Sequence, residues 1–130
     1  MALFGLFGSK DSSVEKETKN IPWERLIRME QLEEISIISK SKPVAIFKHS
    51  SRCGVSSMVL RQFESAYDLE PSQMKLYFLD LLSYRDISNE VGIRFQVYHQ
   101  SPQLIVVKNE VAVHHSSHHN VSAGVLSKFV

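Results

Sequence analysis

The only cysteine of the chain, Cys53, has the residue type and the sequence neighbourhood of a reactive thiol. The thiolate is the nucleophilic form, and a free cysteine with a pKa near ~8.5 is mostly protonated at neutral pH. Arg52 is adjacent, and Lys48 and His49 are close in sequence, so nearby basic side chains favour the charged thiol. A lone cysteine is more often a small buried apolar residue, which leaves an inert thiol as the alternative.

The four residues that begin at Cys53 read Cys-Gly-Val-Ser, where a dithiol oxidoreductase has Cys-x-x-Cys. Gly54 and Val55 separate the thiol from Ser56, which takes the place of the second cysteine. The Ser56 hydroxyl can donate a hydrogen bond to the sulfur but cannot form a disulfide with it. A mixed disulfide at Cys53 would therefore persist until an external thiol attacks it, so the motif predicts a monothiol mechanism.

The elements around the cysteine would place it at a site. A continuous apolar run over 44–47 predicts a central strand buried on both faces, and apolar residues at helical spacing over 55–67 predict a helix. Cys53 then lies in the loop after a strand, where open α/β sheets bind their ligands. The amides at the start of the helix carry positive partial charge, which also favours the thiolate.

The remaining pattern predicts an α/β fold with a central mixed four-stranded sheet flanked by helices. A helix is expected over 29–39, a strand over 75–80 and a short helix over 86–91 that Gly92 ends. Two strands over 103–107 and 111–115 form a hairpin, and a last helix over 123–129 is capped by residues within 120–122.

Length and composition limit the classes of protein. The 130 residues, 43% of them hydrophobic, suit one domain over 21–130 after a flexible polar leader over 1–20. A net charge of +1 without a basic stripe gives no case for nucleic acid. One cysteine excludes a disulfide-stapled secreted domain. The apolar start, 1–8, has no signal-peptide flanks and is too short to span a bilayer, so we expect a cytoplasmic protein without a membrane span; the role of this segment stays open.

Several other polar residues have two readings each. His49 either tunes the thiolate or meets a substrate carboxylate, or it is a surface imidazole or one bonded to a nearby carbonyl. Arg52 either binds carboxylates of an acidic thiol or is a solvated loop arginine. The four histidines within 114–119 suggest a metal, but adjacent strand residues point to opposite faces, so we predict no metal site and no tightly bound cofactor.

Four stretches of the chain resemble the YtxJ-like monothiol bacilliredoxins, and the similarity covers about 21–130. The stretches are FKHSSRCGVSSMVLRQFE (47–64), WERL (23–26), RDISNEVGI (85–93) and SPQLIVVKNEVAVHHSSH (101–118). The resemblance implies a thioredoxin-like fold with Cys53 as the nucleophile and Pro102 as a cis-proline that faces it. The Ser101 backbone would then be free to pair with an extended substrate strand. Gly54 departs from the family pattern, where proline is expected in many members.

The resemblance also implies the activity of a thiol–disulfide oxidoreductase. The expected reaction removes bacillithiol, or a similar low-molecular-weight thiol, from S-thiolated proteins, with that thiol as co-substrate. The alternative is a non-catalytic thioredoxin-like module that binds a thiol or a peptide, or a protein that bridges a cluster as some monothiol glutaredoxins do.

Overall fold

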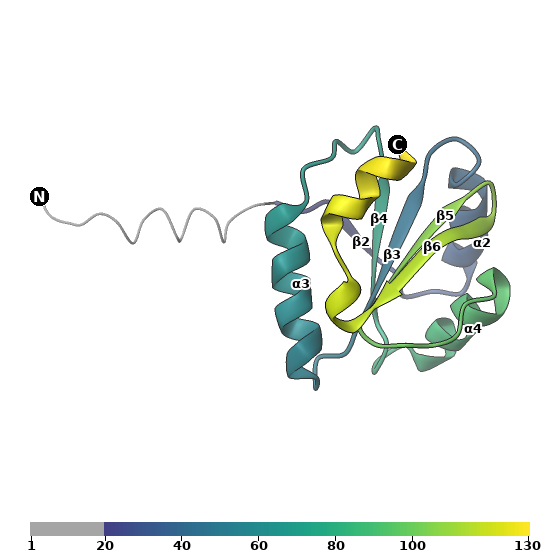
Figure 1. Cartoon of the computed structure of the whole chain (residues 1–130). Coiled ribbons are helices and arrows are strands. Elements are labelled where there is room, and N and C mark those ends of the chain that lie inside the picture. The colour runs from purple at the N-terminus through teal and green to yellow at the C-terminus, as the bar shows by residue number, and fades with distance from the viewer. Residues whose placement is uncertain (1–19) are drawn as a thin grey trace, which may run out of the picture.

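Five strands form one mixed sheet in the order β2-β4-β3-β5-β6 (Figure 1). The computed structural model describes residues 20–130. β3 pairs in parallel with β4 and antiparallel with β5; β2 joins β4 in parallel, and β6 joins β5 antiparallel. The strands are β2 (Trp23–Arg25), β3 (Val44–His49), β4 (Lys75–Asp80), β5 (Gln103–Lys108) and β6 (Val111–Ser117). β3 is the central strand and all six of its residues are buried, as its apolar run predicts.

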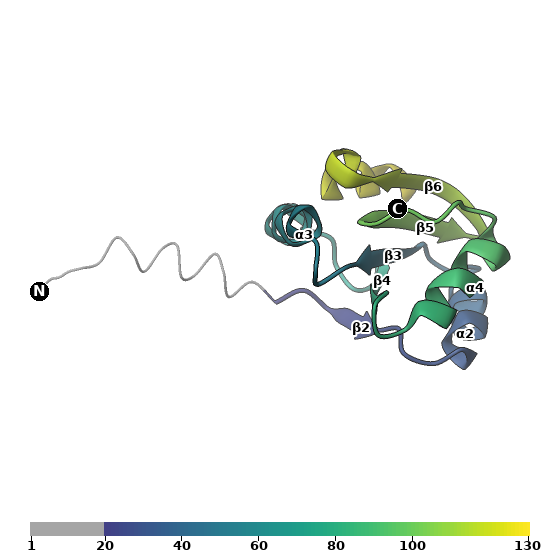
Figure 2. The same cartoon turned by 90° about the horizontal axis from the view of Figure 1, so that it is seen from below.

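Helices cover both faces of this sheet, which gives the α/β layers that the sequence predicts (Figure 2). Two helices, α2 (Glu30–Ile38) and α4 (Arg85–Phe95), lie on one face. The other face is covered by α3 (Gly54–Ala66) and by the 3-10 helix η2 (Ala123–Phe129). A single-turn 3-10 helix, η1 (His118–Asn120), joins β6 to η2.

Side chains of β3 alternate between two separate cores. Val44 and Ile46 belong to the core beneath α2 and α4. Ala45 and Phe47 belong to the core beneath α3 and η2. Because alternation continues along a strand, the next two residues, 48 and 49, also point to opposite faces. The two faces are called the α4 face and the α3 face below.

The prediction of four strands was wrong, because it places no strand over the residues that form β2. β2 is only three residues long, and its register pairs Trp23 with Leu76 of β4. The Trp23 ring packs against Phe47, Phe63 and Phe78, with ring centroids within 6.0 Å in each pair. These contacts are distant in sequence, so no local pattern could reveal the strand.

The end of α4 also differs from the prediction. The helix passes through Gly92 and ends at Phe95, after which Gln96 adopts the left-handed conformation at φ 57°. A Cβ at Gly92 would lie 2.9 Å from the Val97 carbonyl oxygen, so the glycine permits a close approach of the chain instead of ending the helix. The predicted last helix is a 3-10 helix, and Ser122 caps it by accepting from the Gly124 amide.

The predicted leader, 1–20, and its apolar start, 1–8, lie outside the described residues except for Asn20. Within 20–130, no helix has the length and apolar character needed to cross a bilayer.

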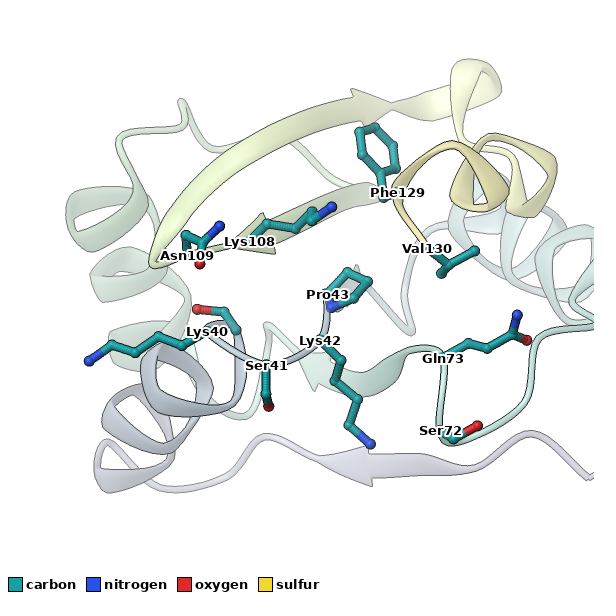
Figure 3. A pocket seen from close by; sticks show the side chains of 11 residues that line it. Lys40, Ser41, Lys42, Pro43, Ser72, Gln73, Lys108, Asn109, Phe129 and Val130 are labelled. Atoms are coloured by element: carbon teal, nitrogen blue, oxygen red, sulfur yellow. The ribbon is translucent and has the colours of Figure 1, made fainter.

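A cavity of about 360 Å³ lies at the end of the sheet where β3 begins (Figure 3). Pro43, which precedes β3, and Lys108, which ends β5, line it together with the C-terminal residues Phe129 and Val130. Cys53 follows the other end of β3 and is not among the lining residues. The cavity is therefore separate from the thiol described next.

Candidate thiol site

Cys53 is half-buried and occupies the N-cap position of α3, four residues after the end of β3. Its amide donates to the Ser50 carbonyl oxygen (3.1 Å), and its own carbonyl oxygen accepts from the Ser57 amide (3.2 Å). The first bond closes a tight turn and the second begins the helix. The turn thus delivers the thiol to the N-terminal end of α3.

Two sources of positive charge adjoin Cys53 in the chain. The first amides of α3, those of Gly54, Val55 and Ser56, have no acceptor within the helix and carry its positive partial charge. Arg52 is exposed and forms no ion pair with any of the residues 20–130. Gly54 is exposed, and a Cβ there would meet no atom within 4 Å, so the first residue of α3, next to Cys53, borders open space.

Ser56 is fully buried and lies against His49. Its Oγ is 2.8 Å from His49 Nδ1 and accepts a hydrogen bond from the Ser50 amide at 3.1 Å. The bond expected between Ser56 and the Cys53 sulfur is not formed in the described chain, because the hydroxyl is engaged beneath the loop. Ser56 therefore links the start of α3 to the end of β3 and to the loop residue Ser50.

His49 is a buried imidazole on the α3 face and not a surface one. Its ring lies 5.4 Å from that of Phe78, and only 9% of the residue is exposed. Burial lowers the pKa of His49, although Asp80 and Glu64 act in the opposite direction. The imidazole is therefore neutral near pH 7, and the positive charge at the thiol comes from the helix and from Arg52.

The Ser101–Pro102 peptide is cis, as the resemblance implies. It directly precedes β5, and Gln103 is the partner of Lys48 near the end of β3. The peptide and the Cys53 loop thus lie at the same end of the sheet (Figure 1). Neither the amide nor the carbonyl of Ser101 forms a hydrogen bond within the described part of the chain. This backbone is available to an extended segment of another molecule.

Lys48 lies away from the thiol, although its sequence position suggests that it is one of the basic side chains near Cys53. It is fully buried on the α4 face, on the side of β3 opposite His49. Its Nζ donates to the Ser88 carbonyl oxygen at 3.1 Å and lies 3.4 Å from His99 Nδ1. Burial lowers the pKa of Lys48 to about 8. Sequence reasoning missed His99 and Ser88, although strand alternation alone places Lys48 and His49 on opposite faces.

The histidines within 114–119 do not form a cluster. His114 is half-buried with its ring 5.6 Å from that of Phe129, whereas His115 is exposed on the other face of β6. Across the described residues, no three His, Cys, Asp or Glu side chains are arranged to hold a metal ion.

Comparisons with known proteins place this geometry in a wider context. A solved structure described as a candidate oxidoreductase with a thioredoxin fold matches at a TM-score of 0.68 and 27% identity, over 82% of this chain and 92% of that one. Thioredoxin from Malassezia sympodialis matches at 0.65 and 18% identity, over 85% and 95% of the two chains. Thioredoxin from Fasciola hepatica matches at 0.58 and 17% identity, over 81% and 93%.

These matches show that the fold is that of thioredoxin. The profile of the family described as "Monothiol bacilliredoxin BrxC" matches residues 24–126, which include the Cys53 loop and the cis-proline. The chain belongs to the monothiol bacilliredoxin family.

Proposed function

We propose that this protein removes a low-molecular-weight thiol, bacillithiol or one similar to it, from S-thiolated proteins, with Cys53 as the nucleophile. The observation that carries the proposal is the half-buried Cys53 thiol at the N-terminus of α3, with Ser56 in the place of a second cysteine. A free thiol acts this way in a reducing compartment, so we place the protein in the cytoplasm.

The reaction needs two exchanges at Cys53. In the first, the thiolate attacks the small-thiol sulfur of the mixed disulfide, a new disulfide forms on Cys53, and the protein sulfur leaves as a thiolate that takes up a proton. In the second, another molecule of the small thiol attacks the sulfur of the small thiol that is bound to Cys53. That step releases the disulfide of the small thiol and regenerates the Cys53 thiolate.

Three features support this sequence of steps. The positive end of α3 and the unpaired Arg52 favour the attacking thiolate. Ser56 cannot resolve the adduct, so the adduct waits for an external thiol. The unbonded Ser101 backbone offers two hydrogen bonds to the polypeptide around the modified cysteine of the substrate.

Mass spectrometry tests the proposal directly. A reporter protein thiolated with bacillithiol is mixed with the wild-type protein, and the masses of both chains are followed with time. We expect the adduct mass to move to Cys53 and to leave when free bacillithiol is added. Cys53→Ser should transfer nothing, and Ser57→Ala, with a hydroxyl of α3 removed near the thiol, should behave as the wild type.

The same measurement separates turnover from binding. A module that only holds a thiol or a peptide would form a complex while the adduct stays on the reporter protein. That outcome, with Cys53 shown to be free and reduced, contradicts the proposed exchange.

A further inference from the structure

The loop between α4 and β5 carries an exposed histidine, His99, two residues before Ser101. Two hydrogen bonds hold the backbone of this loop. The Val97 amide donates to a carbonyl oxygen of α4 (3.1 Å), and Gln103 Nε2 donates to the Tyr98 carbonyl oxygen (2.9 Å). His99 therefore has a defined place beside the peptide that we assign to substrate binding.

Beneath His99 lies the ammonium group of Lys48, which has no exposed surface. Lys48 Nζ is 3.4 Å from His99 Nδ1, and it also donates to the Ser88 carbonyl oxygen on α4. An ammonium group has donors only, so Nδ1 is the acceptor in this contact and the ring proton of a neutral His99 is on Nε2. The exposed ring thus offers an N–H donor to other molecules.

The pair formed by His99 and Lys48 carries one positive charge at neutral pH. Burial lowers the pKa of His99, and so do the neighbouring cations Lys48 of β3 and Arg85 of α4. Lys48, with its pKa at about 8, remains mostly protonated at pH 7. Within the described residues it forms no ion pair with a carboxylate. The charge behind the neutral imidazole is therefore uncompensated.

Two residues that adjoin the same lysine carry unpartnered polar atoms: Ser88, whose carbonyl oxygen accepts from Lys48 Nζ, and Gln103, the cross-strand partner of Lys48. Ser88 Oγ, Ser101 Oγ and Gln103 Oε1 are buried without a hydrogen-bond partner in the described chain. Ser88 and Gln103 are each only 1% exposed. An uncompensated charge among unsatisfied groups is unfavourable for stability, and an apolar side chain in place of Lys48 would fill the space at lower cost. Such arrangements are typical of sites that bind something.

We propose that His99 binds a carboxylate of the small thiol on the substrate, with Lys48 as the positioning residue that keeps the His99 proton on Nε2. The proposal rests on the proposed function, because the thiol adduct must reach Cys53 at the same end of the sheet. A carboxylate is the matching group, since it accepts from Nε2–H and is attracted by the lysine charge behind the ring. His99 would then select small thiols that carry an acid group.

Two substrates that differ only in a carboxylate test the selection. The same reporter protein is thiolated with cysteine or with cysteamine, and the second-order rate of transfer to Cys53 is measured for each. We expect the wild type to take the cysteine adduct about tenfold faster, as one charge-assisted hydrogen bond allows. His99→Phe should bring the two rates within about twofold by slowing only the cysteine adduct. His115→Phe, which changes an exposed histidine on β6, should keep the preference.

A second measurement needs no turnover. Cys53 is modified with 2-carboxyethyl methanethiosulfonate or with the propyl reagent, and the titration of each histidine is followed by nitrogen-15 NMR. We expect the carboxylate adduct to raise the pKa of His99 by at least about half a unit relative to the propyl adduct. In unmodified protein at pH 7 the His99 proton should be on Nε2, and Lys48→Met should move part of it to Nδ1.

The outcomes distinguish the two proposals. Equal rates for both reporter adducts in the wild type, or equal slowing of both by His99→Phe, overturn the His99 assignment and leave the exchange reaction intact. Transfer of neither adduct, combined with the expected NMR shift, overturns the exchange reaction and supports the carboxylate site. A His99 pKa that is the same in the two Cys53 adducts overturns the site whatever the rates.

Discussion

Lys48 and His49 are consecutive residues of β3, yet they build opposite kinds of polar cluster on the two faces of the sheet. On the α3 face, His49 is neutral and Ser56 bonds both the imidazole and the Ser50 amide. On the α4 face, Lys48 is charged, and the adjoining residues Ser88 and Gln103 each have a buried atom that lacks a partner. The first cluster is closed, whereas the second still has hydrogen bonds and charge to offer.

The difference indicates that the His49 cluster and the Lys48 cluster have different functions at the same end of the sheet. A closed set of hydrogen bonds holds its members in one arrangement, which suits a loop that presents the proposed nucleophile, Cys53. An unsatisfied set has a cost in the folded protein that a ligand can relieve, which suits recognition beside the cis-proline. Changes to the α4 face should therefore affect stability and selectivity in opposite senses, and changes to the α3 face should weaken the fold.

The largest effect on stability is expected from Lys48→Met. The pKa of Lys48 falls from 10.5 to about 8 on folding. The unfolded chain therefore binds more protons between these pH values, and wild-type stability rises with pH across this window. Below pH 8 the burial of the ammonium costs the wild type about 3 kcal/mol. Urea unfolding at pH 7 should show the variant to be more stable, by less than this amount because a hydrogen bond to Ser88 is lost.

The pH dependence of this stability difference tests whether the buried ammonium charge is its cause. The advantage of Lys48→Met should shrink as the pH rises through 8 and be nearly gone above about 10.5, since the wild-type lysine is then mostly neutral in both states. An advantage that stays constant with pH would mean that packing, and not charge, separates the two faces. If Lys48→Met is less stable than the wild type at pH 7, the claim that the Lys48 cluster destabilises the folded protein is contradicted.

Ser56→Ala tests the closed cluster and should have the opposite sign. It leaves the buried His49 Nδ1 and the amide of the half-buried Ser50 without their partner, which costs about 1–3 kcal/mol. The matched control is Ser57→Ala, one residue along the helix and half-buried, for which a change within about 0.5 kcal/mol is expected. Urea unfolding at pH 7 measures both variants. Equal effects would show that the His49 contact contributes nothing specific.

The smallest effect is expected from Gly54→Pro, which stiffens the thiol loop without touching either cluster. Gly54 is the first residue of α3, its amide forms no hydrogen bond in the described chain, and Cys53 already has the extended backbone that a following proline requires. A gain of about 0.4–1 kcal/mol should appear as a higher Tm. Gly54→Ala is the control for the added Cβ alone, and a lower Tm for the proline variant would show that the loop needs its glycine.

Local patterns were sufficient to predict the elements that carry Cys53. The apolar run of β3, the helical stripe of α3 and the serine in place of a second cysteine all lie within about twenty residues of sequence, as the periodicity rules require. The cis-proline and the family came from resemblance, because no local signal separates a cis from a trans X-Pro bond.

Only the tertiary structure decided which groups act together. β2 exists because Trp23 packs on rings from three other elements, and Ser56 turns from the Cys53 sulfur to His49 because the end of β3 lies beneath the loop. The contact of Lys48 with His99 joins residues 51 positions apart. Sequence patterns report the face on which a side chain lies, but burial, hydrogen-bond partners and pKa depend on neighbours that the fold brings from elsewhere in the chain.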